Sequence, residues 1–180
     1  MKFNEKIENY IQLIKDYNEH TNIYSKKSYD KLNFHIQDCI NLSNIIGDNK
    51  HILDIGSGSG LPAIILAIEN SNNFVVAVES KSRKTKFLEH VKKELQLKNL
   101  TVIQDDINHY TRKSNQKFDL VTCKAFGSID KIKKCISPLQ TLPSHLYMPI
   151  SENQANEYKL VTNSEIINLS TEYYYLKLRF

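Results

Sequence analysis

The chain has 180 residues, 41% of them hydrophobic and 24% charged, with a formal net charge of +4, values typical of one soluble globular domain. No apolar stretch is long enough to cross a bilayer, the N-terminus lacks the apolar core of a signal peptide, and the three cysteines are scattered without disulfide-type or metal-type spacing. We therefore expect a cytoplasmic protein with reduced thiols, without a membrane partner and without a metal site.

Residues 1–47 are predicted to form a helical N-terminal extension. Apolar residues recur at helical spacing over residues 3–17, which indicates an amphipathic helix. A second helix is predicted over residues 28–46, where apolar positions keep that spacing until Gly47, a typical helix stop.

From residue 51 onward, short apolar runs typical of strands alternate with longer amphipathic runs typical of helices. Strands are predicted over residues 51–55, 74–79, 100–104, 118–123 and 145–150. Helices are predicted over residues 61–69, 83–97 and 128–139, with a short helix or loop over 107–117. Because this alternation favours right-handed crossovers, we expect a Rossmann-like α/β fold with a mostly parallel sheet over residues 48–180. Residues 170–180 are predicted to return as an antiparallel C-terminal edge strand, and the whole chain to form one compact domain.

Three of the five glycines follow the first predicted strand, in a D-x-G-x-G-x-G pattern. They are Gly56, Gly58 and Gly60, and Leu61 and Pro62 begin the next helix. Glycine tolerates positive φ and lets a ligand approach the main chain, and open α/β sheets bind ligands at the carboxyl ends of their strands. We expect this glycine loop (residues 56–61) to make room for a cofactor, and a tight turn without a ligand is the alternative.

The neighbouring acids favour one class of cofactor. Dinucleotide sites use G-x-G-x-x-G, whereas here Leu61 stands at the third glycine position. Asp54 could hold the loop amides or meet a cationic group, and Glu79 ends the second strand, where a carboxylate binds ribose hydroxyls. A ligand without phosphate that carries an ammonium and a sulfonium fits best. These features resemble the S-adenosylmethionine site of class I methyltransferases.

The tip of the fourth predicted strand, TCKAFGS (residues 122–128), limits which kinds of atom could accept the methyl group. It has no Asn/Asp-Pro-Pro-aromatic run of the kind that grips an exocyclic amine. Cys123 lacks the proline neighbour of cytosine C5 enzymes and is interpreted as a buried strand-end cysteine. An acceptor such as guanine N7 carries a free lone pair and needs no general base, so catalysis would depend on positioning and electrostatics.

Five segments in order resemble a specific family over about residues 17 to 150. They are YNEHTNIYS (17–25), FHIQDC (34–39), LDIGSGSGLPAI (53–64), VESKSRKTKFL (78–88) and CKAF (123–126). They are similar to motifs of the bacterial 16S rRNA guanine-N7 methyltransferases, the RsmG or GidB family. The resemblance implies a class I methyltransferase fold with a helical extension, S-adenosylmethionine as the donor, and a guanine of 16S rRNA in the small ribosomal subunit as the acceptor.

The resemblance also implies roles for individual residues. Cofactor contacts are expected from Asp54, Gly56, Gly58, Gly60, Leu61, Glu79, Ser80, Ile107, Asn108 and Lys124. Lys124 stands where the family has an arginine and is the expected catalytic residue, with a positioning role at the junction of cofactor and substrate. His35 and Asp38 are expected to fix the helical extension to the cofactor loop.

Basic residues beside the expected cleft predict an RNA partner. Lys81, Arg83 and Lys84 follow the tip of the second strand and are the best candidates for phosphate contacts. We expect the protein to act as a monomer.

Departures from the family pattern leave two alternatives open. Asp106 stands where the family has an arginine, and Ile150 and Ser151 stand in place of a Lys-Gly pair. These differences reduce the positive charge near the expected position of the methyl acceptor. One alternative is a non-catalytic, ribosome-associated protein that binds S-adenosylmethionine or RNA. The other is a small-molecule methyltransferase, which would leave the basic cluster unexplained.

Overall fold

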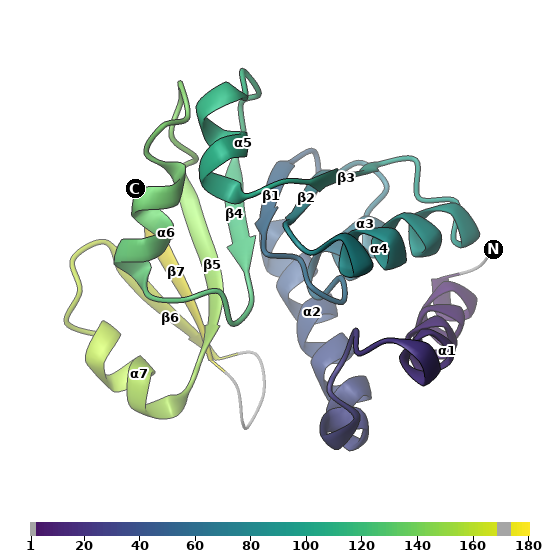
Figure 1. Ribbon diagram of the computed structural model, residues 1–180. Coiled ribbons are helices and arrows are strands. Elements are labelled where there is room, and N and C mark those ends of the chain that lie inside the picture. The colour runs from purple at the N-terminus through teal and green to yellow at the C-terminus, as the bar shows by residue number, and fades with distance from the viewer. Residues whose placement is uncertain (1–2, 169–173) are drawn as a thin grey trace.

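A computed structural model describes residues 3–168 and 174–180, and its helices and strands alternate from residue 51 onward as expected (Figure 1). The helices are α1 (Phe3–His20), the 3-10 helix η1 (Lys26–Lys31), α2 (Leu32–Ile46), α3 (Ala63–Glu69), α4 (Ser82–Glu94), α5 (Ile107–Lys113), α6 (Ile129–Ile136) and α7 (Glu152–Tyr158). The strands are β1 (His51–Ile55), β2 (Phe74–Glu79), β3 (Leu100–Gln104), β4 (Leu120–Cys123), β5 (His145–Ile150), β6 (Ser164–Asn168) and β7 (Tyr174–Arg179).

The described strands form one seven-stranded sheet in the order β3-β2-β1-β4-β5-β7-β6. Strands β1 to β5 are parallel, whereas β7 pairs antiparallel with both β5 and β6. The carboxyl ends of β1, β2, β3 and β4 therefore lie at one edge of the sheet, which places the glycine loop beside Glu79 and Lys124. The expected α/β fold with a mostly parallel sheet is confirmed.

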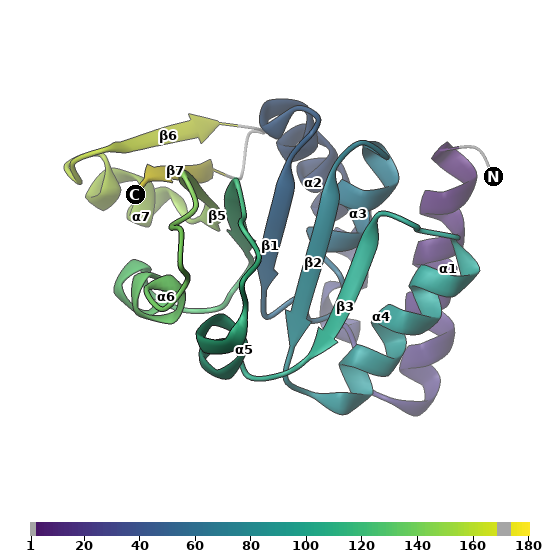
Figure 2. The same cartoon turned by 90° about the horizontal axis from the view of Figure 1, so that it is seen from above.

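Helices cover both faces of the sheet, as Figure 2 shows from above. Helices α1 to α4 pack on one face and α5 to α7 on the other, and each face has its own hydrophobic core. Successive residues of β1 alternate between the faces, so that Ile52 belongs to the first core and Leu53 to the second. Because α1 packs on α3 and α4, the helical extension shares a hydrophobic core with the α/β region. The division of the chain at residue 47 into an extension and an α/β domain stays a prediction.

The two ends of the described chain differ from expectation. The second helix begins at Leu32 rather than at residue 28, because η1 precedes it and Ser28 has non-helical backbone angles. The predicted C-terminal strand forms β7 but is not the edge, since β6 lies outside it. Residues 170–173 of that prediction lie outside the described residues. Neither α7, where only Ala155 is buried, nor β6 was predicted.

Within residues 3–168 and 174–180, no helix is long and apolar enough to cross a membrane. Over the same residues, the His, Cys, Asp and Glu side chains form no group of three or more that could hold a metal ion.

Candidate active site

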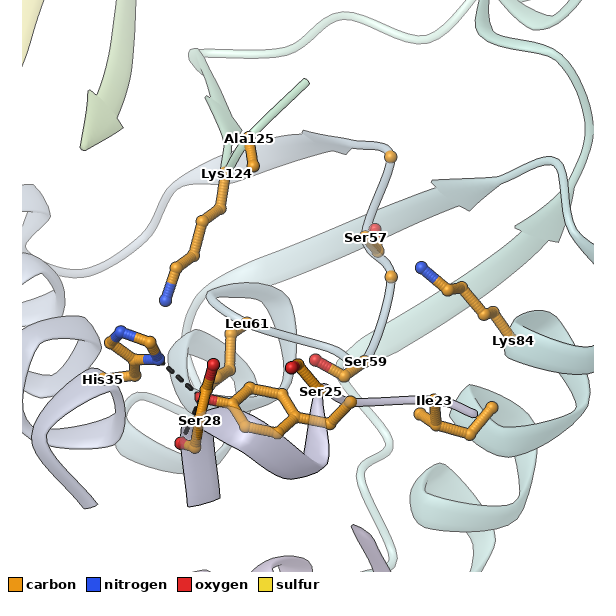
Figure 3. A pocket seen from close by; sticks show the side chains of 13 residues that line it. Ile23, Ser25, Ser28, His35, Ser57, Ser59, Leu61, Lys84, Lys124 and Ala125 are labelled. Carbon is orange, nitrogen blue, oxygen red and sulfur yellow. Dashed lines mark hydrogen bonds between the residues drawn. The ribbon is translucent and has the colours of Figure 1, made fainter. Parts of the chain in front are cut away.

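A cavity of about 300 Å³ opens where the helical extension faces the carboxyl ends of β1 and β4 (Figure 3). Its lining comes from five parts of the chain: Ile23, Tyr24, Ser25 and Ser28 before and within η1; His35 of α2; Gly56, Ser57, Gly58, Ser59 and Leu61 of the glycine loop; Lys84 of α4; and Lys124 and Ala125 after β4. Of the predicted cofactor residues, the cavity thus brings together two glycines, Leu61 and Lys124.

The glycine loop is held by main-chain hydrogen bonds in a conformation that requires glycine. The amides of Gly56 and Ser57 both donate to the carbonyl of Val78, at 2.9 and 3.2 Å. Gly56, Gly58 and Gly60 have φ values of 67°, 60° and 101°, in the left-handed region that other residues rarely adopt.

The three glycines differ in what a side chain would meet. A Cβ on Gly56 would lie 2.7 Å from the ring of Phe126. A Cβ on Gly60 would collide with Ile64 and lie 3.2 Å from the hydroxyl of Tyr10. A Cβ on Gly58 would meet nothing closer than Lys84 Nζ at 3.6 Å. Packing within the protein therefore also requires glycine at positions 56 and 60, and the expectation that the loop makes room for a cofactor stays a prediction.

Asp54 at the end of β1 is a buried carboxylate with one unpaired oxygen. Its Oδ1 accepts a hydrogen bond from Thr122 Oγ1 at 2.7 Å. Its Oδ2 is buried and has no hydrogen-bond partner among the described residues. Burial raises the pKa of Asp54 to about 6, against the lowering effect of the nearby Ser57 hydroxyl, which donates to the main-chain carbonyl of Asp54 at 3.2 Å, and of the hydrogen bond from Thr122. An orphaned carboxylate oxygen in this position fits a cationic group such as the ammonium of S-adenosylmethionine.

Glu79 ties the glycine loop to the start of α4. Its Oε2 accepts the main-chain N–H of Gly58 at 2.9 Å, and its Oε1 accepts that of Lys81 at 2.8 Å. The side chain is 6% exposed, so these two amides fix its direction. Each oxygen has a further lone pair for a ligand hydroxyl, and the ribose-binding role of Glu79 stays a prediction.

The residues expected to contact the adenine of the cofactor, which are Ser80, Ile107 and Asn108, do not line the cavity, and neither does Asp106. Asp106 caps α5 and accepts both the main-chain N–H and the side-chain amide of Asn108, at 2.9 and 3.1 Å. Ile107 is buried at the first position of this helix, and Ser80 is exposed just before α4. Asp106 thus has a structural role as a helix cap, which the sequence comparison with the family arginine did not indicate.

Lys124 emerges after β4 and points towards His35 (Figure 3). Burial lowers the pKa of the Lys124 ammonium, while the nearby Cys39 and Asp38 act in the opposite direction. Burial raises the pKa of Asp38, which a hydrogen bond with Tyr175 and the charge of Lys124 oppose. Burial and the charge of Lys124 lower the pKa of His35 to about 4, so its imidazole is neutral at pH 7.

His35 and Asp38 therefore approach Lys124, and a different residue ties the extension to the glycine loop. The hydroxyl of Tyr10 in α1 donates a hydrogen bond to the carbonyl of Ser59 at 2.7 Å. In the sequence, Tyr10 is one of the apolar residues that recur at helical spacing over residues 3–17, and nothing distinguishes it from Tyr17 in the same range.

The three basic residues predicted to contact RNA separate into two groups. Lys81 and Arg83 are exposed beside the start of α4, whereas Lys84 points into the cavity towards the glycine loop (Figure 3). At the end of β5, Ile150 is buried, and Ser151 begins α7 with a capping box in which it pairs with Gln154. The position of the family Lys-Gly pair is therefore used here to start a helix.

The strand order, with the antiparallel β7 between β5 and β6, and the glycine loop after β1 are those of the class I S-adenosylmethionine-dependent methyltransferase fold. A SAM dependent methyltransferase from Aquifex aeolicus has the same fold, with a TM-score of 0.62 and 11% identity over 86% of this chain and 97% of that one. An rRNA methylase from Streptococcus thermophilus matches with a TM-score of 0.57 and 12% identity over 80% of this chain and 93% of that one.

The chain belongs to the family described as rRNA small subunit methyltransferase G, GidB, which matches residues 3–175. Ribosomal RNA small subunit methyltransferase G of Brachyspira hyodysenteriae is 40% identical over 145 residues, which are 80% of this chain and 69% of that protein. The protein of the same name from Fusobacterium nucleatum is 34% identical over 130 residues, 71% of this chain and 56% of that protein. The family resemblance drawn from the five sequence segments is confirmed, although the chain spans little more than half of the Fusobacterium relative.

Proposed function

We propose that this protein transfers a methyl group from S-adenosylmethionine to N7 of a guanine in 16S rRNA. The observation that carries the proposal is the convergence of four groups at one edge of the sheet, in a chain of this family. They are the glycine loop, the unpaired oxygen of Asp54, the carboxylate of Glu79 and the ammonium of Lys124.

Each end of the cofactor has candidate partners among the described residues. Asp54 would bind the ammonium and Glu79 the ribose hydroxyls, while Gly58 lets the ligand approach the main chain. Leu61 lines the cavity together with Gly58. Ser80, Ile107 and Asn108, at the tips of β2 and β3, would surround the adenine. S-adenosylmethionine supplies an electrophilic methyl group on a sulfonium.

The chemistry at N7 requires no proton transfer from the base. N7 of guanine already has a free lone pair in the major-groove edge of the base, so the protein needs to position the base and exclude water. Lys124 would donate a hydrogen bond to O6, the acceptor next to N7, and thereby hold N7 towards the methyl group. Lys124 is a positioning group in this mechanism, and the carboxyl group of Asp38 lies near it.

The exposed Lys81 and Arg83 would contact phosphates of the RNA, which predicts that binding weakens as salt rises. A ribosomal substrate would place the reaction in the cytoplasm, and we propose that one copy of the chain is sufficient for it.

The test is methyl transfer from labelled S-adenosylmethionine to small ribosomal subunits taken from cells that lack the protein. We expect label in 16S rRNA, mapped to N7 of a guanine, and the comparison of intact subunits with deproteinised rRNA identifies the form of the substrate. Cofactor binding without transfer to either substrate would contradict the proposal and favour a non-catalytic protein. Transfer to a small molecule, unaffected by salt, would favour the other alternative.

A further inference from the structure

Tyr24 contributes an aromatic side chain to the cavity, and its main chain is fixed by one buried amide. Asn18 is 3% exposed, and its Oδ1 accepts the N–H groups of Ile23 and Tyr24 at 2.7 and 3.1 Å. Its Nδ2 donates to the carbonyl of Tyr24 at 2.6 Å. The backbone of Tyr24 is therefore held at both of its polar groups by a single side chain.

The ring of Tyr24 is fixed as well. Its hydroxyl forms a hydrogen bond of 2.6 Å with Nδ1 of His35, and its ring lies nearly parallel to that of Tyr29, with centroids 6.2 Å apart and an angle of 16°. Asn18 also donates from Nδ2 to the hydroxyl of Tyr29 at 2.6 Å. Such an arrangement orders the aromatic face before any ligand arrives, which lowers the entropy cost of binding.

The rest of the lining suits a nucleobase next to this ring. Four serine hydroxyls, from Ser25, Ser28, Ser57 and Ser59, offer donors and acceptors, and two lysines supply positive charge. A volume of about 300 Å³ suits a single base rather than a strand. The adenine of the cofactor is expected at the tips of β2 and β3, so it does not account for an aromatic group contributed by the helical extension.

We propose that Tyr24 is the stacking surface for the acceptor purine, which lies against its ring when the base is turned out of the RNA. This inference rests on the proposed function. Enzymes that modify a base extrude it into a pocket and hold it by stacking and by hydrogen bonds to its edges. Tyr24 is therefore a binding contact that holds the nucleobase in the cavity by stacking.

The chain contains no tryptophan, which allows a direct binding test. Tyr24→Trp would carry the only indole of the protein, inside the cavity. With S-adenosylhomocysteine at saturation, we expect guanosine monophosphate to quench its fluorescence in a saturable manner. The matched control is Phe74→Trp, a 41% exposed position at the amino end of β2, where no quenching is expected. Quenching by S-adenosylhomocysteine alone, with no further change on adding the nucleotide, would overturn the proposal.

Kinetics with small ribosomal subunits distinguish the contribution of the Tyr24 ring from that of its hydroxyl. Tyr24→Leu removes the stacking surface, and we expect the KM for the subunits to rise about tenfold while the affinity for S-adenosylhomocysteine is unchanged. Tyr24→Phe keeps the ring and is expected within about threefold of the natural protein, since the hydrogen bonds of the hydroxyl to His35 and to the carbonyl of Ser28 are lost but the stacking surface stays. Equal impairment of both variants, or of neither, would overturn the stacking role. Because the fluorescence test needs no turnover, absence of methyl transfer by the natural protein would contradict the proposed function and leave this test intact.

Discussion

Tyr10 in α1 donates a hydrogen bond from its hydroxyl to the carbonyl of Ser59 in the glycine loop, at 2.7 Å. Tyr10 is fully buried, and its hydroxyl is one of the atoms that a Cβ on Gly60 would approach. The helical extension and the glycine loop therefore contact one another directly, and the proposed cofactor site includes a residue of the extension.

Tyr10→Phe should lower both stability and cofactor affinity. Loss of the hydroxyl leaves the carbonyl of Ser59 without its donor, at an expected cost of about 1 kcal/mol in the free energy of unfolding. The loosened loop should weaken S-adenosylhomocysteine binding, measured by calorimetry. The matched control is Tyr110→Phe, which breaks a hydrogen bond to Gln116 on the other face of the sheet. An unchanged affinity in Tyr10→Phe would show that the loop keeps its shape without this hydrogen bond.

The glycines of the loop should respond differently to alanine. Gly60→Ala places a Cβ against Ile64 and Leu88 in the core, so we expect a large loss of stability or no folding. Gly58→Ala has space for the methyl group but keeps a positive φ, which costs about 1 to 2 kcal/mol. Thermal unfolding should rank the two in that order, and Gly58→Ala should fold yet bind cofactor weakly. Equal destabilisation of both variants would contradict this assignment.

Cofactor affinity should depend on pH through Asp54. Its pKa of about 6 means that the carboxylate is mostly ionised at pH 7 and mostly protonated at pH 5. Because a cationic group favours the ionised form, S-adenosylhomocysteine should bind up to about tenfold more tightly at pH 7 than at pH 5. Asp54→Asn should bind weakly and lose this dependence. A pH profile that is the same in both proteins would remove Asp54 from the cofactor site.

The same carboxylate should make the empty protein less stable as pH rises. Its pKa in the folded state lies above the unfolded value of about 3.9, so the folded state binds more protons between pH 4 and 6. The contribution to stability is present below pH 4 and is lost as pH rises through 6. The melting temperature of Asp54→Asn minus that of the natural protein should therefore increase across this window. A constant difference would mean that the folded pKa is not raised.

Lys124→Ala should reduce turnover on small ribosomal subunits by about 100-fold, because a mispositioned base reacts slowly. Lys93→Ala on the exposed side of α4 removes an equal charge away from the cavity and should retain full activity. The affinity for S-adenosylhomocysteine separates a cofactor role from a substrate role for Lys124. Normal turnover in Lys124→Ala would remove this residue from the mechanism.

The sequence predicts the central part of the fold well, for physical reasons. Buried parallel strands such as β1 and β2 are short apolar runs, and each is followed by a helix, which is the almost entirely buried α3 after β1 and the amphipathic α4 after β2. The local pattern and the tertiary structure therefore agree. The C-terminal hairpin is less visible. Residues 164–168 form an edge strand that is only partly buried, and α7 buries a single alanine, so neither produces a clear hydrophobic period.

The sequence predicts residues of the candidate site only where positions close together in the chain form a recognisable motif. The glycine spacing and the acids at two strand tips indicated Asp54, Gly58 and Glu79. A contact between distant segments left no such signal: Tyr10 reaches Ser59 across 49 positions. Asn18 lies in one of the five family-like segments, but only the structure shows that it organises residues 23 and 24. Lys84, predicted to contact RNA beside Lys81, lines the cavity because of where α4 packs, which only the structure reveals.

The most direct test of the central claim is a calorimetric titration of the folded protein with S-adenosylhomocysteine and, separately, with NAD. We predict saturable binding of one S-adenosylhomocysteine per chain, greatly weakened in Gly58→Ala and Asp54→Asn, and no binding of NAD. Absence of heat with S-adenosylhomocysteine, or occupation of the same site by NAD, would contradict the assignment of the glycine loop as a methyl-donor site.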